Sequence, residues 1–543
     1  MMLSLLWLLP TALAAQPSAP DPISAPLRPL DFGQLNFIHT TDTHGWLAGH
    51  LQEPSYSADW GDYHIDLLTS GNHELYQKNT SEAELLITVP NFRGNYLASN
   101  IDIIHPTTKQ LVPLAPRFKK FTTKNQGIRI VAFGFLFDFN GNYNNTVVQK
   151  VSSTIKEDWF QEAIRDKEVD LFLVIGHVPV HSPEYRAIFK EIRGIRWDTP
   201  IQFFGGHQHV RDYAQYDSKA FGLASGRFME TVGFMSIDGL ASKTSRQSAA
   251  GPVFKRRYID NNLFSYYHHT GLDRETFPTE KGLNVSRMIA KARTDLHLDQ
   301  VHGCAPHDLW MSRTKYPDPN SIYTWLETEV LRDLKDESRG DIPRLAIVNT
   351  GAMRFDIFKG PFTQDSTFIV SPFTSTFRYV KDVPYDKAQL IVDVLNEQPQ
   401  VLYETTDESS PTTLAPPEQL AYPEDVIAQQ WPSASEQIPL SGPDLVPGYT
   451  TQDDAGTDGD DTIHSPISFY RVPNCIRALV SPNASETPKT VDLVYLDFIE
   501  KYVILAAKFA GLDVDIAKES DAYMPHVSLT NLILDWVKKN WEC

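Results

Sequence analysis

The sequence predicts an α/β protein built from two layered domains. Three observations lead to this expectation: the length of 543 residues, the alternation of short apolar strands with amphipathic helices, and polar motifs that directly follow the strands. A chain of this length exceeds what one hydrophobic core organises, so two large domains are expected. Strands alternating with helices are typical of a sheet that is flanked by helices.

The first domain is expected over 31–262, as a layered β-sheet with helices on its faces. Short apolar runs predict its strands at Leu35–Thr40, Ile65–Thr69, Ile128–Phe137, Val169–Ile175 and Ile201–Phe204. Helical periodicity covers Val147–Lys167 and Glu184–Arg193.

The second domain is expected over 321–543, after a linker at 263–320. A strand is predicted at Arg344–Val348, with helices at Tyr385–Asn396, Val491–Ala510 and Leu529–Trp541. The stretch 404–461 is dense in Pro, Thr, Ser, Asp and Glu, which predicts a disordered insertion. Its acidic end, Asp453–Asp461, lacks the 12-residue spacing and terminal Glu of a calcium loop. A solvated loop is therefore favoured there over a calcium site.

The N-terminus resembles a secretory signal. Residues 1–15 form an apolar run that ends in Ala12-Leu13-Ala14, a small-residue cleavage pattern, and a flexible leader is expected at 16–30. Glycosylation sequons begin at Asn79, Asn144, Asn284 and Asn483, as expected for a secreted protein, and no later stretch predicts a membrane span. The three cysteines, Cys304, Cys475 and Cys543, allow one disulfide and leave an odd thiol.

The charge balance excludes one class of partner. The net charge is −19, from 49 basic and 68 acidic residues. Such a chain does not neutralise nucleic-acid phosphates, so DNA or RNA is excluded as the main partner. A small phosphorylated substrate held by metal ions stays possible, because the charge of the ions dominates locally.

Four polar motifs follow predicted strands of the first domain. They are Asp42-Thr43-His44, Gly71-Asn72-His73-Glu74, Gly176-His177 and Gly205-Gly206-His207-Gln208-His209. Open α/β sheets place their sites at the carboxyl ends of strands, so these side chains are expected to converge. Each motif is common by chance, but four in this order predict one site.

The donor types indicate a two-metal centre. Imidazole and carboxylate groups suit Zn, Mn or Fe rather than Ca. Two such ions about 3.5–4 Å apart activate a water molecule and clamp a phosphoryl group. Glycines beside the donors let the backbone turn sharply, and a histidine that binds no metal can protonate the leaving oxygen.

The order of these motifs resembles the signature of the calcineurin-type metallophosphoesterases, in their 5'-nucleotidase-like branch. The stretch Asn95–Ile101 also resembles this branch. The resemblance implies that one divalent metal binds Asp42, His44 and His209. It implies that a second binds Asn72, His177 and His207, with His73 as transition-state stabiliser or general acid.

The second domain extends the resemblance. Its Asn349-Thr350-Gly351-Ala352-Met353-Arg354 is similar to the N-G-G-G-x-R motif of 5'-nucleotidase C-terminal domains, and Ser371-Pro372-Phe373 to their P-F turn. The resemblance implies an α/β domain in which Asn349, Arg354 and Phe373 bind a nucleotide. Arg suits phosphate or ribose and Phe offers a stacking face, although plain core packing is the alternative for Phe373.

Two further features of the sequence concern the substrate and the subgroup within the family. The second aromatic clamp of the family is absent, so the choice between nucleotides and other phosphate esters or diesters stays open. His464-Ser465-Pro466-Ile467 and Pro473-Asn474-Cys475 are similar to fungal secreted or vacuolar members.

Two departures from the family pattern bear on activity. Tyr76 stands where the family has an Asp that orients the histidine. The G-D-x-x-D/E-G motif, whose Asp bridges the two metals, is missing: Gly61-Asp62 is the only Gly-Asp pair between the first two motifs, and it lacks the rest of the pattern.

Chain length supports the same conclusion. The 28 positions from His44 to Asn72 accommodate one parallel crossover, whereas the family needs two. A βα segment is therefore expected to be missing near 64–65, which makes the second metal site doubtful.

The sequence thus predicts a metal-dependent phosphate-ester hydrolase, most like a 5'-nucleotidase. The alternatives are a truncated or inactive member that binds metal or nucleotide, and a phosphodiesterase with the same core.

Overall fold

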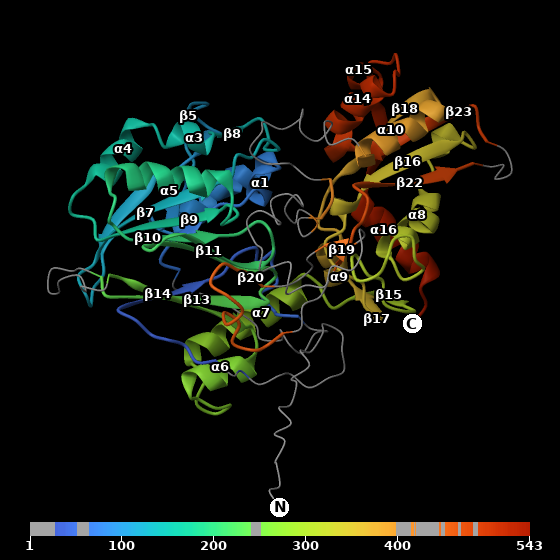
Figure 1. Cartoon of the computed structure of the whole chain (residues 1–543). Coiled ribbons are helices and arrows are strands. Elements are labelled where there is room, and N and C mark those ends of the chain that lie inside the picture. The colour runs from blue at the N-terminus through green and yellow to red at the C-terminus, as the bar shows by residue number, and fades with distance from the viewer. Residues whose placement is uncertain are drawn as a thin grey trace, which may run out of the picture. The chain divides into compact units, whose positions relative to one another are not determined.

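The structure is a computed structural model, and Figure 1 shows the course of the chain. It describes residues 26, 28–50, 65–240, 251–397, 414–416, 419, 445–446, 451–464, 469–481 and 487–543. The expected signal peptide at 1–15, most of the leader at 16–30, the Asn483 sequon and the Gly61-Asp62 pair lie outside the described residues.

The chain divides into two compact units, each of which is mixed α/β, as the sequence predicts. Unit 1 comprises Met1–Ile289 and Thr450–Pro466, and unit 2 comprises Ala290–Tyr449 and Ile467–Cys543. The chain therefore leaves unit 1, returns to it for a short stretch, and leaves it again.

The largest sheet of the described part of unit 1 has seven strands. In spatial order they are β20 (Gln452–Asp453), β11 (Arg211–Asp217), β12 (Ala220–Ser225), β10 (Ile201–Gly205), β9 (Leu171–His177), β7 (Arg129–Leu136) and β6 (Phe118–Thr122). The central strands β12, β10, β9 and β7 are parallel to their neighbours in this group. Their carboxyl ends therefore lie along one edge of the sheet.

A second sheet and three helices cover the two faces of this sheet. The second sheet has the order β1 (Leu35–His39), β13 (Thr231–Asp238) and β14 (Val253–Asp260). Figure 1 shows α3 (Val151–Thr154), α4 (Asp158–Arg165) and α5 (Pro183–Ile195) on the opposite side.

Alternate residues of the central strands serve these two layers. Phe133 and Phe172 belong to the core cluster that includes the helices, whereas Ala132 and Leu173 belong to the cluster that includes the second sheet. Because successive side chains of a strand point to opposite faces, one apolar strand fills both cores.

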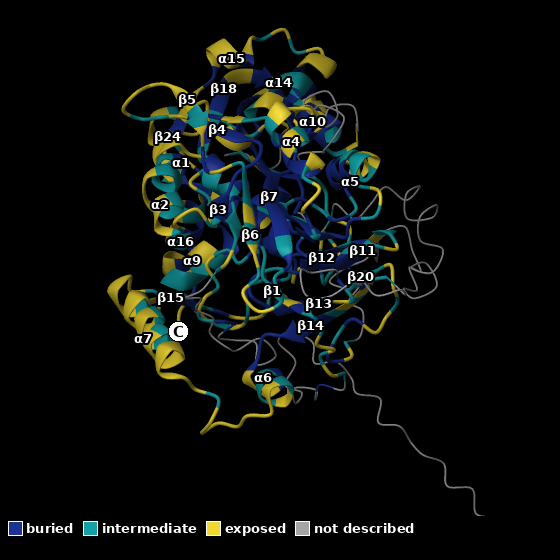
Figure 2. Ribbon diagram, turned by 90° about the vertical axis from the view of Figure 1, so that its left-hand side faces the viewer, coloured by how far each residue is buried: buried dark blue, intermediate teal, exposed yellow. Residues whose placement is uncertain are grey.

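Short elements complete unit 1. The strands are β2 (Leu68–Thr69), which pairs with β3 (Tyr96–Leu97), and β4 (Ile101–Ile104), which pairs with β5 (Leu111–Pro113) and β8 (Thr146–Val148). The helices are η2 (His73–Leu75), α1 (Lys78–Ala83), η3 (Glu84–Thr88), α2 (Val89–Asn91), α6 (Leu263–Thr270) and α7 (Glu280–Asp295), which runs into unit 2. Figure 2 shows that α7 is largely exposed.

Two expectations for this region are wrong. The helix expected over Val147–Lys167 is broken, because Thr146–Val148 pairs with β4 as a strand and only α3 and α4 are helical. The β-branched pair Val147-Val148 favours a strand over a helix.

The acidic end of the expected insertion also differs from expectation. Residues 451–464, called the strap below, belong to unit 1 instead of forming a solvated loop. Its Gln452 and Asp453 pair in parallel with β11, and Tyr258 and Asp461 are joined by a backbone hydrogen bond of 2.9 Å. Gly459 permits this approach, because a Cβ there would lie 2.7 Å from the Tyr258 ring.

Unit 2 is organised around one mixed sheet. The described strands have the order β22 (Cys475–Val480), β16 (Arg344–Asn349), β23 (Thr490–Leu496), β18 (Thr376–Pro384) and β24 (Asp521–Ser528). Its helices include α8 (Ile322–Thr328), η4 (Val330–Asp333), η5 (Glu337–Arg339), η6 (Thr350–Ala352), α9 (Gln364–Val370), α10 (Tyr385–Glu397), η8 (Asp497–Ile499), α14 (Glu500–Phe509), α15 (Ile516–Glu519) and α16 (Leu529–Asn540). A short pair, β19 (Leu445–Val446) with β21 (Phe469–Tyr470), also belongs to this unit.

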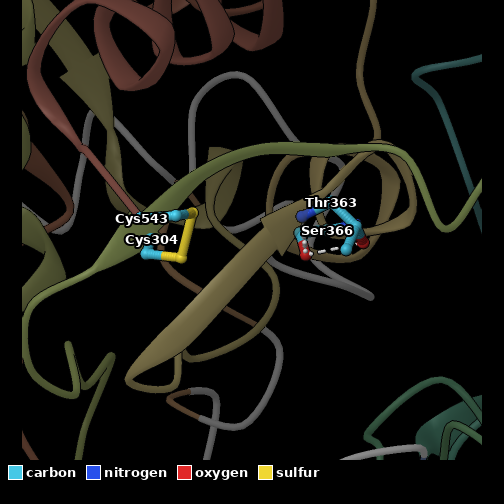
Figure 3. The surroundings of a disulfide bond; sticks show 4 residues. All are labelled: Cys304, Thr363, Ser366 and Cys543. Atoms are coloured by element: carbon cyan, nitrogen blue, oxygen red, sulfur yellow. Dashed lines mark hydrogen bonds between the residues drawn. A yellow bond between two sulfur atoms is a disulfide. The ribbon is translucent and has the colours of Figure 1, made fainter.

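Unit 2 begins earlier than the sequence suggests. Much of the expected linker 263–320 is structured, because β15 (Val301–Ala305) pairs with β17 (Gly360–Thr363). Figure 3 shows the disulfide that joins Cys304 to Cys543, near the helix cap formed by Thr363 and Ser366. Cys475 is the odd thiol and is buried, so the expectation of one disulfide is confirmed.

The helix expected over Val491–Ala510 is only half correct. Thr490–Leu496 is the central strand β23, and the helix α14 starts at Glu500. Five apolar or aromatic residues in seven suit a strand buried on both faces as well as a helix, so periodicity did not separate the two. Among the described residues, no helix has the length and apolar character needed to cross a bilayer.

Candidate metal centre

The sequence motifs of unit 1 occupy the ends of strands in the structure. Asp42 and His44 follow β1, His177 is the last residue of β9, and His207 and His209 follow β10. Asn72 and His73 follow β2, where the short helix η2 begins. The sequence predicts this placement correctly.

Asp42 lies at the centre of the cluster. Its Oδ2 accepts hydrogen bonds from the backbone N–H of His207 at 2.9 Å and from the Thr41 hydroxyl at 2.7 Å. Its Oδ1 is buried and accepts no well-directed hydrogen bond. That oxygen lies 3.3 Å from His209 Nε2 and 3.8 Å from His177 Nε2.

The protonation state of Asp42 follows from these neighbours. Burial alone would raise the pKa of its carboxyl group, but His177, His209 and His44 outweigh burial and hold the pKa well below its usual range. Asp42 is therefore a carboxylate with one oxygen directed at a group of imidazoles.

Three side chains around this oxygen form a potential ligand set. Donor atoms of Asp42, His44 and His209 all lie within 4.8 Å of one another. The Nε2 atoms of His44 and His209 are 3.3 Å apart. A carboxylate and two imidazoles suit a transition metal, and the buried Oδ1 of Asp42 accepts no well-directed hydrogen bond from the chain. The residues present therefore fit a divalent cation.

A second group lies beside the first. His207 Nδ1 and His177 Nε2 are 3.3 Å apart. A Cβ on Gly71 would lie 3.5 Å from the His177 ring, which brings the backbone next to Asn72 close to this pair. The Asn72 Oδ1 is buried and accepts no hydrogen bond, as in Asp42. These donors are all neutral, so this group is the weaker candidate.

Tyr76 has a contact that the sequence did not predict. The Asn72 Nδ2 donates to the Tyr76 hydroxyl at 2.7 Å, which leaves Oδ1 as the free end of the amide. The ring of His73 packs edge-on against both Tyr76, at 5.1 Å between centroids, and His44, at 4.8 Å. Tyr76 thus contacts His73, where the family has an Asp, and also holds Asn72.

The backbone of the cluster is strained. Asp42 (φ 49°), His44 (φ 46°), His207 (φ 78°) and His209 (φ 62°) all adopt left-handed conformations. Each costs on the order of 1–3 kcal/mol for a residue other than glycine, and such strain gathers at functional sites. The neighbouring Gly206 cannot be replaced easily, because a Cβ there would lie 2.1 Å from Thr41 Oγ1.

Two phenylalanines that the sequence did not indicate support the histidines. Phe137 stacks on His207 with ring centroids 4.2 Å apart, and Phe228 packs edge-on against His44 and His209 at 5.2 and 5.4 Å. A single Phe outside a motif carries no signal in the sequence, because its role depends on contacts made by folding.

Two of the three predicted substrate residues of unit 2 are in contact. The Arg354 guanidinium lies 4.9 Å above the centroid of the half-buried Phe373 ring. Asn349 ends β16, and its Nδ2 donates to the Leu414 carbonyl while its buried Oδ1 accepts no hydrogen bond. These three residues therefore combine a cation, an aromatic face and an available amide oxygen.

Comparison with known proteins gives the context of both units. Residues 308–504 match the model of the NAD nucleotidase C-terminal domain. A secreted protein of Arthroderma benhamiae is 35% identical over 606 residues, covering 93% of this chain and 90% of the relative. An uncharacterized protein of Schizosaccharomyces pombe is 35% identical over 553 residues, covering 88% and 86%. Both alignments are longer than this chain, so the relatives contain residues that have no counterpart here.

One solved structure is similar over almost the whole length. The 5'-nucleotidase from Candida albicans is 34% identical and superimposes with a TM-score of 0.81, covering 95% of this chain and 100% of that protein. This identity and coverage confirm the resemblance that the sequence motifs indicate. The chain therefore belongs to the 5'-nucleotidase-like family of metallophosphoesterases.

Proposed function

We propose that this protein is a metal-dependent phosphate-ester hydrolase of the 5'-nucleotidase type, with reduced activity in the form described. The observation that carries the proposal is the buried Oδ1 of Asp42, a carboxylate oxygen that faces three imidazoles and accepts no well-directed hydrogen bond. Leaving such an oxygen without a partner costs stability unless a cation binds it. The similarity to the Candida albicans 5'-nucleotidase supports nucleotides as the substrate class.

The residues divide into three roles. Asp42, His44 and His209 are the ligands of the stronger site, and His177, His207 and Asn72 are those of the weaker site. Zn, Mn or Fe ions bound there supply water activation and charge neutralisation for phosphoryl transfer. His73 donates a proton to the leaving oxygen or stabilises the transition state. Asn349, Arg354 and Phe373 bind the nucleotide, with Phe373 stacking on the base and Arg354 contacting phosphate or ribose.

Reduced activity follows from the missing bridging carboxylate. Two dications about 4 Å apart repel each other about four times as strongly as two unit charges do, and a shared carboxylate offsets this repulsion. In the described part of unit 1, Asp42 is the only acid in the ligand group. The alignments that exceed the length of this chain are consistent with a missing segment, and the spacing from His44 to Asn72 is the reason for proposing it near 64–65. The competing proposal, a member that binds metal or nucleotide without efficient catalysis, rests on the same gap.

Secretion or vacuolar delivery is the proposed destination. Three of the sequon residues, Asn79, Asn144 and Asn284, are exposed, so a glycan can be attached to each without disturbing the core. The Arthroderma relative is named a secreted protein, which supports the signal peptide proposed at 1–15.

The test measures metal binding and phosphate release on the purified full chain. We expect one tightly held Mn²⁺ per chain and slow, chelator-sensitive phosphate release from a nucleoside monophosphate and an aryl phosphate. At a metal concentration of 100 times Kd, binding raises the unfolding free energy by about 2.7 kcal/mol. His209→Ala removes this gain, whereas His297→Ala, at an exposed histidine of unit 2, keeps it.

The outcomes separate the alternatives. No metal-dependent stabilisation would contradict the proposed centre. Metal binding without any phosphate release would favour the inactive member. Two tightly held ions with fast turnover would contradict the proposed impairment.

A further inference from the structure

The strap carries an acidic surface that is almost fully paired with unit 1. Its Asp453 and Asp458 contact Arg256, Asp460 contacts Arg211, and Asp461 lies 2.8 Å from His269 Nε2. His464 adds a contact of 2.9 Å to Asp260. The strap has the composition of a solvated loop, yet it contacts the rest of unit 1 through several ion pairs and hydrogen bonds.

One of these contacts reaches the segment that follows His177. Both carboxylate oxygens of Asp454 lie 3.2 Å from His181 Nε2, and His181 Nδ1 lies 3.0 Å from Asp212 Oδ2. His181 comes four positions after His177, and Asp212 comes three positions after His209. The buried imidazole of His181 therefore ties the strap to two segments that carry proposed ligands.

A second contact reaches the segment that follows His209. The guanidinium of Arg211, which is buried, donates to Asp460 at 2.8 Å, to Asp260 at 2.7 Å and to the Thr231 hydroxyl at 2.7 Å. Arg211 is two positions after His209. Its three partners, on the strap, β14 and β13, leave the backbone at His209 little freedom to move.

These contacts lie next to ligand residues whose backbone is strained. His207 and His209 hold left-handed conformations that persist only when the surrounding structure fixes them. We propose that the strap is a positioning element of the metal centre: Asp454 and Asp460 hold the segments that carry His177, His207 and His209 and thereby set metal affinity. This inference rests on the proposed function of that centre. It assigns a role in the centre to residues that lie more than two hundred positions further along the chain.

The test compares acidic residues within the strap. Asp454→Asn and Asp460→Asn each remove one carboxylate charge beside a ligand segment, and we expect the double variant to bind Mn²⁺ about 10–100-fold more weakly. Asp458→Asn is the control, because it removes one carboxylate charge from the same strap at an exposed Asp that pairs with Arg256 on β14. The exposed carboxylate contributes little, and Arg256 keeps its pair with Asp453, so the Mn²⁺ affinity of this variant should stay near that of the wild type.

A milder variant guards against loss of folding. Thr451→Val removes only the hydroxyl that donates to Asp460 at 2.7 Å, and it should weaken Mn²⁺ binding less than Asp460→Asn does. Thermal midpoints in chelator, measured for every variant, show whether the fold survives. Hydrogen exchange of β11 should increase in the double variant and stay unchanged in the control.

The outcomes distinguish this inference from the proposed function. A wild-type chain that binds no Mn²⁺ overturns the metal centre and the inference together. A wild-type chain that binds Mn²⁺, with the double variant binding equally well, overturns the inference alone. Equal weakening by Asp458→Asn would also overturn it, because the effect would then be general destabilisation of the strap.

Discussion

Two clusters in unit 1 use acidic and histidine side chains in opposite ways. In the candidate metal centre, the buried Oδ1 atoms of Asp42 and Asn72 accept no hydrogen bond. In the strap, Asp454 and Asp460 are paired with His181 and Arg211. The first cluster is a potential ligand set of one carboxylate and two imidazoles, whereas the carboxylates of the second cluster pair with cationic groups of the chain itself. The number of Asp and His residues therefore does not by itself distinguish a candidate binding site from a cluster that is paired within the chain.

The largest expected effect comes from completing the first cluster. Inserting a βα segment that carries the G-D-x-x-D/E-G motif between His64 and Ile65 should raise phosphate release about 1,000-fold. A gain of that size equals about 4 kcal/mol of transition-state stabilisation, which is the range for metal activation. Bound metal per chain should rise from one to two.

The same insertion with the bridging Asp changed to Ala is its control. This control restores the sheet without the carboxylate, so it should keep one metal and low activity. Equal activity in both forms would mean that the missing strand, and not the missing charge, limits this chain.

Removing the central cation of the second cluster should lower the unfolding free energy of unit 1. Arg211→Leu leaves the carboxylates of Asp260 and Asp460 buried without their shared cation, and removing one partner of a buried pair costs about 3–5 kcal/mol. Urea unfolding in chelator measures the loss. His44→Ala in the metal centre should cost less under the same conditions, and an equal cost would contradict the contrast between the clusters.

Rising pH should weaken the second cluster. Burial alone would lower the pKa of His181, but Asp212 and Asp454 outweigh it and raise the pKa to about 9. Because the folded pKa exceeds the unfolded value of 6.5, this stabilisation is complete below about pH 6.5 and is lost as the pH rises through 9. The unfolding free energy should fall by on the order of 3 kcal/mol over this pH range.

Unfolding free energies at pH 6 and pH 9.5 measure this change. His181→Gln should remove most of the difference between the two values. A variant with an unchanged pH dependence would show that His181 is not the titrating group.

The smallest expected effect concerns unit 2. In the chain with the restored segment, Arg354→Ala should raise KM for a nucleotide about 10-fold and leave KM for an aryl phosphate nearly unchanged. The loss corresponds to about 1.4 kcal/mol, as for a partly exposed contact to an anionic ligand. Phe373→Leu keeps an apolar side chain and removes the stacking face. An unchanged KM in both variants would remove the proposed nucleotide contact.

The placement of the candidate ligands directly after strands could be predicted because its information is local. The Gly205–His209 motif and the Gly71–Glu74 motif each specify residue types within five positions, and each directly follows an apolar strand. The parallel strands β9 and β10 then bring His177, His207 and His209 to one edge of the seven-stranded sheet. Asp42 and His44 follow β1 of the second sheet and Asn72 follows β2 of a third, so their approach depends on how the sheets pack, which strand assignment alone does not predict.

The strap could not be predicted because its partners are distant in the sequence. Nothing near Asp460 indicates Arg211, and the composition around it is that of a disordered segment. The pairing of Cys304 with Cys543 could not be predicted for the same reason, because the two cysteines are far apart in the sequence. The error at Thr490–Leu496 is different, since a short apolar run suits both a buried strand and a helix until the neighbouring strands β16 and β18 are known.

The return of the chain to unit 1 has a consequence for its synthesis. The ribosome completes the sheet strands from β1 to β14 long before it reaches Thr450, yet β20 and the carboxylates that pair with Arg211 and Arg256 come only then. At about 5–20 residues per second, the interval is on the order of ten seconds or more. During that time the nascent unit 1 lacks the strap carboxylates that pair with Arg211 and Arg256 and the strand β20 that pairs with the edge of β11. A chaperone that binds cationic surfaces, or a short acidic peptide supplied in translation extracts, would compete with the strap for these arginines.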